Sequence, residues 1–402
     1  MDHRPLPLVL MLLSVAAAAP AWAQFPGIPG SEPRQRPIEM PRFRDRSPGR
    51  PTQGTPALVV VQRDGVRQAV GAGDVPPPPG DIAVAIVQDA GVLAAPGTAV
   101  LVLSDGQRLV GALDVDKGVP TWVSPWLAPR AVDLAMVRAL VFPGGREPDV
   151  RDEDVVELRN GDRVTGAISS IMPDRIVVER GVGETAERFE VSMQDVLSVG
   201  IVGTDEPWTG VRAWLQDGTV LNAAKAEWLG GEHLQFPSLR GAKLPVASVP
   251  RRAVAAVQSG PAAAVPLAAM SAEASHPASI PPERRRESLP APSPMDGTWP
   301  LDAPPIEIEG PVVLRYAGTG APATLSCSVT RPAAARAAGV MELVVRSGGK
   351  EVRKERFGPD RPTSDLCVPL EPGPFELELT TPDGSIAGCF MVLRQALVLP
   401  SR

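Results

Sequence analysis

Short runs of alternating apolar and polar residues recur along most of this chain, and polar turns separate them. One pair of runs, at residues 155–158 and 163–168, flanks Asn160 and Gly161. Alternation with a period of two predicts half-buried strands, and Asn-Gly between two such runs is a strong hairpin signal. The pattern therefore predicts a tight hairpin here, in which both turn residues take positive φ.

The same hairpin pattern occurs three times at nearly constant spacing. Similar units stand at residues 100–111 and 211–221, and the three turn glycines, Gly106, Gly161 and Gly218, lie 55 and 57 residues apart. A fixed period of this length indicates repeated structural units. Further apolar runs follow each hairpin, so that each unit has about five short strands, which suits a small, strongly bent barrel with one apolar face.

The alternation resumes after Trp299 and continues almost to the end of the chain. Seven or eight candidate strands fit into about 100 residues, a density typical of a sandwich or jelly roll. The predicted fold class is therefore all-β: tandem small β-barrel-like repeats followed by a C-terminal, jelly-roll-like β-sandwich.

The N-terminus has the pattern of a secretory signal peptide. A basic residue, Arg4, precedes an apolar run at residues 6–19, and Ala21-Trp22-Ala23 forms a small-x-small cleavage pattern before Gln24. Because no later apolar run reaches the length of a membrane span, we expect none after signal cleavage. The prediction is an exported, soluble protein, periplasmic or extracellular.

Changes in composition divide the chain into seven predicted segments. Proline, arginine and glycine dominate the residues after the signal peptide, and alanine, proline and serine dominate those before Trp299. The predicted segments are a signal peptide (1–23), a disordered tether (24–56), a small β repeat with a diverged N-terminal extension (57–146), two small β-barrel-like repeats (147–205 and 206–259), a linker (260–296) and a β-sandwich (297–402).

The composition argues against several classes of function. The formal net charge is −6, which disfavours nucleic acid as a partner. The sequence has no phosphate-binding loop, no nucleophile elbow and no histidine–cysteine spacing that suits zinc. We therefore expect a protein that is not an enzyme and that needs neither a cofactor nor a metal.

The repeats resemble LSm/SH3-like small barrels. The residues that carry the resemblance run from Leu158 through Asn160, Gly161 and Asp162 to Gly166, and an apolar pair closes the unit. The resemblance covers about residues 97–260 and implies a small bent barrel. Some families of this kind bind RNA, but an exported acidic chain without a basic, aromatic surface does not fit that role.

The C-terminal region resembles the NPCBM-type carbohydrate-binding modules of exported bacterial proteins. The matching segments, in order, are residues 325–329, 340–352, 362–370, 375–379 and 385–399. The resemblance implies a β-sandwich that binds sugar. Two positions depart from it, because Cys389 and Leu393 stand where the family usually has Asp and Trp.

Two aromatic residues of this region are the candidate ligand contacts. Sugar sites pair a flat aromatic ring with planar polar groups, and strand phenylalanines usually belong to a core. Trp299 and Tyr316 are the remaining aromatic residues here.

All three cysteines lie in the last quarter of the chain. An oxidising compartment permits one disulfide between two of them, with three possible pairings, or three unpaired thiols. The early and final strands of a jelly roll are often neighbours, so Cys327–Cys389 is the preferred pair.

Two classes of function remain open. In the first, the C-terminal module binds polysaccharide at the cell envelope or outside the cell, and the repeats act as spacers. In the second, the chain is a structural or protein-interaction scaffold of the envelope that binds no sugar. Exposed tryptophans would then contact envelope proteins, and the candidates are Trp122, Trp126, Trp208, Trp214 and Trp228.

Overall fold

Antiparallel strands joined by tight turns build this protein. The computed structural model describes residues 57–71, 74–87, 93, 97–181, 187–237, 247–278, 299–332, 339–382 and 389–401. The predicted signal peptide and tether lie outside these residues. The helices of the described chain are short 3-10 turns, and no described helix has the length and apolarity to cross a membrane.

Three consecutive units share one order of elements, as the periodic hairpins predicted. Each has a hairpin, two or three middle strands, a 3-10 turn and a closing strand that pairs with the first strand of the hairpin. The first repeat comprises β4 (Ala99–Leu103), β5 (Arg108–Asp116), β6 (Val119–Val123), β7 (Arg130–Ala131), η2 (Leu134–Met136) and β8 (Val137–Val141).

The second repeat comprises β9 (Val155–Leu158), β10 (Arg163–Thr165), β11 (Ala167–Ile171), β12 (Arg175–Arg180), β13 (Glu187–Ser192), η4 (Met193–Asp195) and β14 (Val196–Gly200). The third comprises β15 (Val211–Leu215), β16 (Val220–Ala223), β17 (Glu227–Leu229), β18 (His233–Phe236), β19 (Ala247–Pro250), η5 (Arg251–Ala253) and β20 (Val254–Ser259). The middle strands of the second and third repeats form separate three-stranded sheets, β11-β12-β13 and β17-β18-β19. In the described residues no pairing closes any repeat into a ring, so the repeats are small all-β units without a closed barrel.

The hairpin turns have one geometry, and it differs from the predicted one. Gly161 N donates to Leu158 O (3.0 Å), and Leu158 N donates to Asp162 O (2.9 Å). Gly161 has a φ of 92°, whereas Asn160 is not among the residues with positive φ. The loop is thus a three-residue turn with a glycine bulge. Asn160 instead accepts a hydrogen bond from Asp162 N (3.0 Å) through its side chain. Gly106 and Gly218 occupy the equivalent places.

A fourth copy of the hairpin precedes the three repeats. We call it the N-terminal unit: β1 (Leu58–Val61), β2 (Arg67–Val70), η1 (Pro79–Asp81) and β3 (Val84–Val87). β1 pairs with both β2 and β3, and Gly65 closes the turn with the same hydrogen bonds as Gly161. The sequence predicted this segment as an extension of the first repeat, but β3 pairs with β20 of the third repeat instead.

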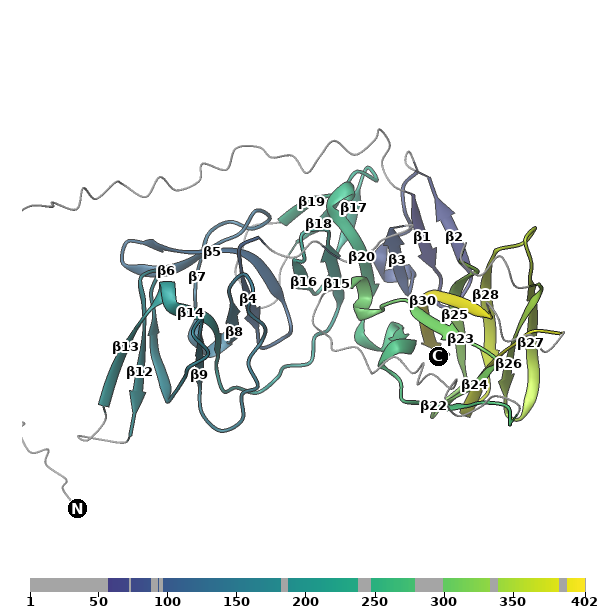
Figure 1. Cartoon of the computed structure of the whole chain (residues 1–402). Coiled ribbons are helices and arrows are strands. Elements are labelled where there is room, and N and C mark those ends of the chain that lie inside the picture. The colour runs from purple at the N-terminus through teal and green to yellow at the C-terminus, as the bar shows by residue number, and fades with distance from the viewer. Residues whose placement is uncertain are drawn as a thin grey trace, which may run out of the picture. The chain divides into compact units, whose positions relative to one another are not determined.

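The units join edge to edge into one sheet of fourteen strands (Figure 1). The closing strands β8 and β14 pair with each other, as do β20 and β3. Val220 of β16 pairs with Arg108 of β5, which links the first repeat to the third. Paired edges leave fewer unsatisfied backbone groups. Gly54–Arg402 form one compact unit, so the repeats are not independent domains joined by flexible linkers.

Several central strands are buried on both faces. β3, β4 and β16 are buried at every position. The continuous apolar runs of β3 and β4 reflect this, because a strand that faces water on one side alternates instead. One face packs into the core of the repeats, where Leu109, Leu140 and Val156 are almost completely inaccessible.

The C-terminal domain is a β-sandwich, as predicted. Its first sheet has the order β21-β30-β25-β28, with β23 also paired to β30, and its second has the order β22-β24-β29-β26-β27. The strands are β21 (Val265–Pro266), β22 (Ala272–Ser275), β23 (Ile306–Glu309), β24 (Val312–Thr319), β25 (Ala323–Thr330), β26 (Met341–Ser347), β27 (Lys350–Phe357), β28 (Thr363–Leu370), β29 (Gly373–Thr380) and β30 (Phe390–Pro400).

The first part of the predicted linker belongs to this sandwich. β21 pairs with β30 and β22 pairs with β24, so the domain begins before Trp299 and residues 260–275 are not a linker. Two 3-10 turns, η6 (Pro261–Ala263) and η7 (Leu267–Ala269), flank β21. Residues 279–296 of the predicted linker lie outside the described residues.

An apolar cluster joins the sandwich to the fourteen-stranded sheet. Leu397 and Leu399 of β30 pack with Ile86 of β3 and Trp214 of β15. Leu301, in the 3-10 turn η9 (Pro300–Asp302), belongs to the same cluster. Each of these side chains is at most 2% exposed. The two parts of the fold therefore share a hydrophobic interface.

Replacing a turn glycine tests the shared turn geometry. We expect Gly161→Ala to destabilise the protein by about 1 kcal/mol, because a Cβ disfavours positive φ. The effect is conformational, since a Cβ at Gly161 would meet nothing within 4 Å. Urea unfolding of the full chain measures it. Gly203→Ala is the control, because Gly203 also has open space but no positive φ; equal stability of the two variants would contradict the turn assignment.

Chain cleavage before Trp299 tests the revised boundary of the sandwich. A specific protease site inserted at residues 285–290 should yield two fragments that stay together in gel filtration, because β21 and β22 pair with strands of the C-terminal fragment. Mild denaturant should then separate them. Immediate release of a folded fragment that starts near residue 299 would show that these pairings are dispensable.

Candidate functional site

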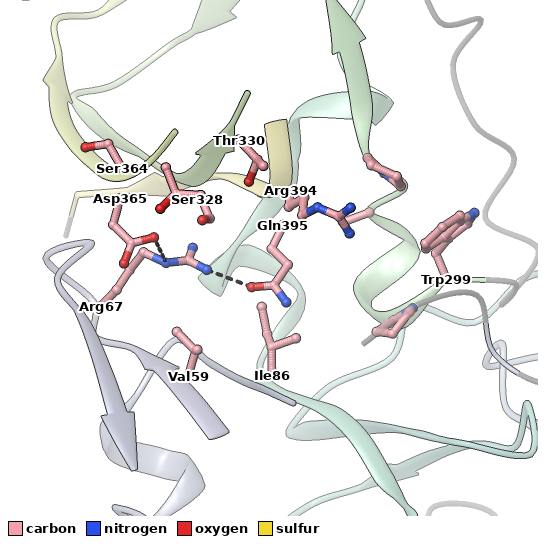
Figure 2. Close-up of a pocket in the computed structure, with 14 residues that line it drawn as sticks. Val59, Arg67, Ile86, Trp299, Ser328, Thr330, Ser364, Asp365, Arg394 and Gln395 are labelled. Carbon is pink, nitrogen blue, oxygen red and sulfur yellow. Dashed lines mark hydrogen bonds and ion pairs between the residues drawn. The ribbon is translucent and has the colours of Figure 1, made fainter. Parts of the chain in front are cut away.

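A cavity of about 750 Å³ lies between the N-terminal unit and the first sheet of the sandwich. Figure 2 shows the side chains that line it. The N-terminal unit contributes one residue from each of its strands, and the sandwich contributes residues of β25, β28, β30 and the segment around η9. The lining residues are Val59, Arg67, Ile86, Trp299, Pro300, Ala303, Pro305, Ser328, Thr330, Thr363, Ser364, Asp365, Arg394 and Gln395.

The hairpin turn of the N-terminal unit is anchored on the sandwich. Ser326 Oγ, in β25, donates to the carbonyl oxygen of Gly65 (3.0 Å), and Cys367 Sγ, in β28, lies 3.6 Å from that of Asp64. A side chain at Gly65 would collide with Thr324, since a Cβ there would approach that residue's Cγ2 to 2.4 Å. This close contact places the start of β2, and with it Arg67, against the sandwich.

Arg67 is the central charged residue of the cavity. Its side chain is only 4% exposed. Its Nη2 donates to Gln395 Oε1 (2.7 Å), and its Nε lies 3.6 Å from Asp365 Oδ1. Figure 2 shows the guanidinium between these two residues. Burial lowers the pKa of the Arg67 guanidinium, and the Asp365 carboxylate opposes the shift.

Gln395 owes its place to an irregularity in β30. Between the pairs Ser326–Leu397 and Ser328–Arg394, β30 contains one more residue than β25. Gln395 takes the left-handed conformation there, with a φ of 49°. Such a bulge redirects a side chain, and the strained conformation persists where its surroundings hold it. Here the Gln395 amide contacts Arg67 and also donates to Val87 O (3.4 Å).

The rest of the cavity wall combines hydroxyl groups with one indole. Ser328, Thr330, Thr363 and Ser364 contribute the hydroxyls, and the half-buried Trp299 stands before η9. Arg394 adds a second guanidinium on an exposed position of β30. A flat ring together with planar and hydroxylic hydrogen-bonding groups suits a polar ligand that also presents an apolar face.

The two predicted ligand contacts, Trp299 and Tyr316, lie in different environments. Trp299 lines the cavity. Tyr316 is only 2% exposed, and its ring stacks on Phe375 with centroids 5.0 Å apart. Burial raises the pKa of the Tyr316 hydroxyl. This ring is part of the sandwich core, so its prediction as a ligand contact is corrected.

The predicted Cys327–Cys389 disulfide does not form in the described chain. The strands are neighbours as expected, because β25 pairs with β30. However, Cys327 lies opposite the bulge at Gln395, and Cys389 precedes the first residue of β30. Six residues of strand correspond to about 20 Å. The register therefore keeps the two sulfur atoms apart.

The sequence did not identify most of the cavity residues. Arg67 lies in an ordinary strand pattern after a turn, and Asp365, Arg394 and Gln395 lie in the C-terminal strands. None belongs to a recognisable motif, since they meet only when two distant parts of the chain pack. Among the described residues, no three His, Cys, Asp or Glu side chains are placed to hold a metal ion.

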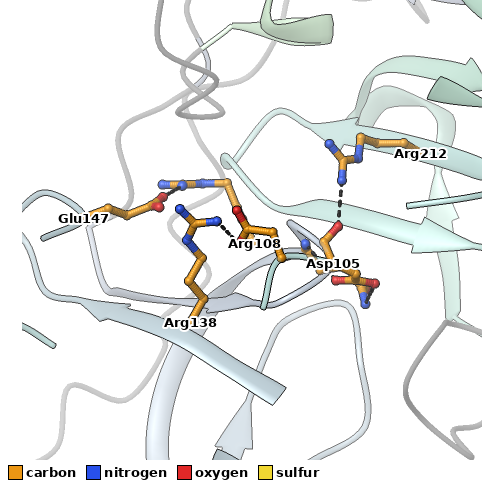
Figure 3. A network of polar contacts seen from close by, with 7 residues as sticks. Asp105, Arg108, Arg138, Glu147 and Arg212 are labelled. Atoms are coloured by element: carbon orange, nitrogen blue, oxygen red, sulfur yellow. Dashed lines mark hydrogen bonds and ion pairs between the residues drawn. The ribbon is translucent and has the colours of Figure 1, made fainter. Parts of the chain in front are cut away.

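A second polar cluster joins the first and third repeats and has a structural role (Figure 3). The carbonyl oxygen of Asp105 accepts hydrogen bonds from Arg212 Nη2 (2.9 Å) and Asn222 Nδ2 (2.7 Å). Arg212 Nε donates to Asn222 Oδ1 (2.7 Å). Burial lowers the pKa of Arg212 to about 10, although Asp302 and Asp105 oppose the shift. Nearby, Arg108 pairs with Glu147. Because these groups pair with one another through hydrogen bonds and an ion pair, the cluster stabilises the junction of β5 and β16.

The tryptophans proposed for protein contacts are not exposed. Trp122 and Trp214 are 1% and 2% exposed, and Trp126, Trp208 and Trp228 are half-buried. Arg212 lies over Trp208, with its guanidinium carbon 4.6 Å from the ring centroid. Trp122 and Trp214 belong to apolar cores, and Trp126 and Trp228 pack against the core of the repeats.

No family model matches the sequence, and no curated protein matches it. Solved structures show weak similarity. The CBM51-2 and INT domains of Clostridium perfringens ZmpB, in complex with GlcNAc, align at 10% identity with a TM-score of 0.27, over 55% of this chain and 45% of that chain. This chain thus matches less than half of the Clostridium structure.

Two further structures are similar at the same low level. The Bacillus thuringiensis delta-endotoxin Cry8Ea1 aligns at 9% identity with a TM-score of 0.22, over 79% of this chain and 54% of that chain. A carbohydrate-binding module of the β-sandwich superfamily aligns at 9% identity with a TM-score of 0.15, over 65% and 88% of the two chains. Similarity this weak assigns neither a fold nor a ligand to this chain.

Thiol labelling tests the placement of the cysteines. At pH 7.5 we expect a maleimide to label Cys367 slowly and the two buried cysteines not at all. Burial raises the pKa of Cys327 to about 12 and also raises that of Cys367, so the reactive thiolates are scarce. Labelling of Cys367 should accelerate as the pH rises. Mass spectrometry should find three labels after denaturation without reductant; a single label there would reveal a disulfide.

Proposed function

We propose that this chain is an exported, non-enzymatic protein that binds polysaccharide in the cavity between the N-terminal unit and the sandwich. The observation that carries the proposal is the composition of that cavity. An indole, two guanidiniums, an amide and four hydroxyl groups surround a space of about 750 Å³. The signal-peptide pattern supports export, because such a segment directs secretion.

A sugar fits the chemistry of this lining. Sugars present many hydroxyl groups together with faces of C–H bonds, so they need planar hydrogen-bonding groups and an aromatic ring in one place. Trp299 offers the ring, and Gln395 and Arg394 offer planar polar groups. The volume lies within the range of about 300–1,000 Å³ that is usual for small-molecule sites, which accommodates part of a longer chain.

This proposal differs from the site that the sequence suggested. The C-terminal module alone does not form the cavity, because Val59, Arg67 and Ile86 come from the N-terminal unit. A fragment that begins near residue 297 would also lack β21 and β22. Binding should therefore be measured on the full chain. The alternative role as a protein-interaction scaffold has less support, since the tryptophans invoked for it are buried or half-buried.

Binding to a panel of soluble and insoluble polysaccharides tests the proposal. We expect saturable binding by the full chain, and Trp299→Ala should weaken it about tenfold, which corresponds to the loss of about 1.4 kcal/mol of stacking. Phe189→Ala is the matched control, because Phe189 is 38% exposed on β13 and does not line the cavity. The proposal fails if the folded chain binds none of the polysaccharides, or if Trp299→Ala binds as well as Phe189→Ala.

A further inference from the structure

Arg67 has hydrogen-bonding capacity that the protein does not use. A guanidinium carries five N–H donors. One donor of Arg67 serves Gln395 Oε1. Nε and Nη1 are buried and have no hydrogen-bond partner, and Asp365 Oδ1, at 3.6 Å from Nε, is too distant for one.

Burying donors of Arg67 without acceptors costs free energy unless a bound molecule accepts hydrogen bonds from them. Buried charged groups are normally paired and hydrogen-bonded, because they lose their hydration. Arg67 is almost completely buried yet lines a cavity of about 750 Å³. Arg67 is therefore the buried charged group that a molecule in the cavity would approach.

The charges of the lining indicate what kind of molecule this is. Arg67 and Arg394 contribute two positive charges, and Asp365 contributes one negative charge. The Asp365 side chain is 63% exposed, so water screens much of its attraction for Arg67. The cavity thus has one formal positive charge in excess, which a singly charged anionic group would balance.

We propose that the cavity selects polysaccharides with carboxylate groups, such as those built from uronic acids, and that Arg67 binds the carboxylate. This inference rests on the proposed function and names its ligand class. A carboxylate is planar and matches the fork of a guanidinium with two parallel hydrogen bonds. Nη1, which is buried without a partner, and the second proton on Nη2 would form such a pair of donors when a bound carboxylate displaces the side chains packed on Nη1.

A purely structural role for Arg67 predicts a different pattern. If Arg67 only tied β2 to β30, a hydrogen bond to Gln395 would suffice, and the other donors would be paired or exposed. Instead Nε and Nη1 are buried without a hydrogen-bond partner. Residues that serve a ligand often leave the empty protein less stable than it would be without them. We therefore expect Arg67→Met to melt at the same or a higher temperature than the unmodified chain.

The experiment compares acidic and neutral ligands on the full chain. The probes are oligogalacturonate, a neutral galactan oligosaccharide of the same length and a sulfated galactan oligosaccharide, measured by isothermal titration calorimetry. We expect oligogalacturonate to bind at least tenfold more tightly than the neutral probe, and its affinity to fall as NaCl increases. Arg67→Met should lower the affinity for oligogalacturonate at least tenfold and so remove this preference.

A second variant keeps the test decisive if Arg67→Met does not fold. Asp365→Asn removes the competing carboxylate at an exposed position, so it should raise the ratio of acidic to neutral affinity severalfold. Equal affinity for acidic and neutral probes, or an unchanged ratio in Asp365→Asn, would overturn the inference and leave polysaccharide binding standing. Tighter binding of the sulfated probe would overturn the carboxylate assignment. Binding of no probe would overturn the proposed function and this inference together.

Discussion

The pairing of strand edges is the constraint on which the rest of the structure depends. A bent sheet of about 50 residues buries only part of its surface and leaves exposed backbone groups at both edges. Here the closing strand of one unit covers the closing strand of another, at β8–β14 and at β3–β20. The four units therefore stabilise one another as a single sheet.

This pairing also determines where the sandwich docks. Because β3 pairs with β20, the N-terminal unit lies beside the third repeat, and the two present one apolar face. Leu301 and the end of β30 pack on that face. The turn at Gly65 then meets β25 and β28, where Ser326 and Cys367 contact its backbone. The cavity lies beside these contacts, between the N-terminal unit and the first sheet of the sandwich.

The contrast between Arg212 and Arg67 shows how the fold uses charge. Arg212 lies in a network with Asp105 and Asn222 and stacks on Trp208, so its environment is complete within the protein. Arg67 has a comparable degree of burial but an incomplete set of partners. Buried polar groups that the fold satisfies stabilise a junction, whereas those that it leaves unsatisfied beside a cavity indicate a ligand. Arg67 is the arginine that the fold leaves unsatisfied beside a cavity.

The sequence by itself determined the local structure. Alternation and the Asp-Gly and Asn-Gly turns predicted the hairpins, the period of the repeats and the all-β sandwich, because each depends on residues close together in the chain. Only the tertiary structure decided the rest. The partner of each strand edge, the bulge at Gln395 and the approach of Arg67 to Asp365 involve residues up to 328 positions apart. Edge pairing uses backbone groups, which carry no sequence signal. The register of β30 against β25 keeps Cys327 and Cys389 apart, and the pairing of β24 with β29 stacks Tyr316 on Phe375 in the core.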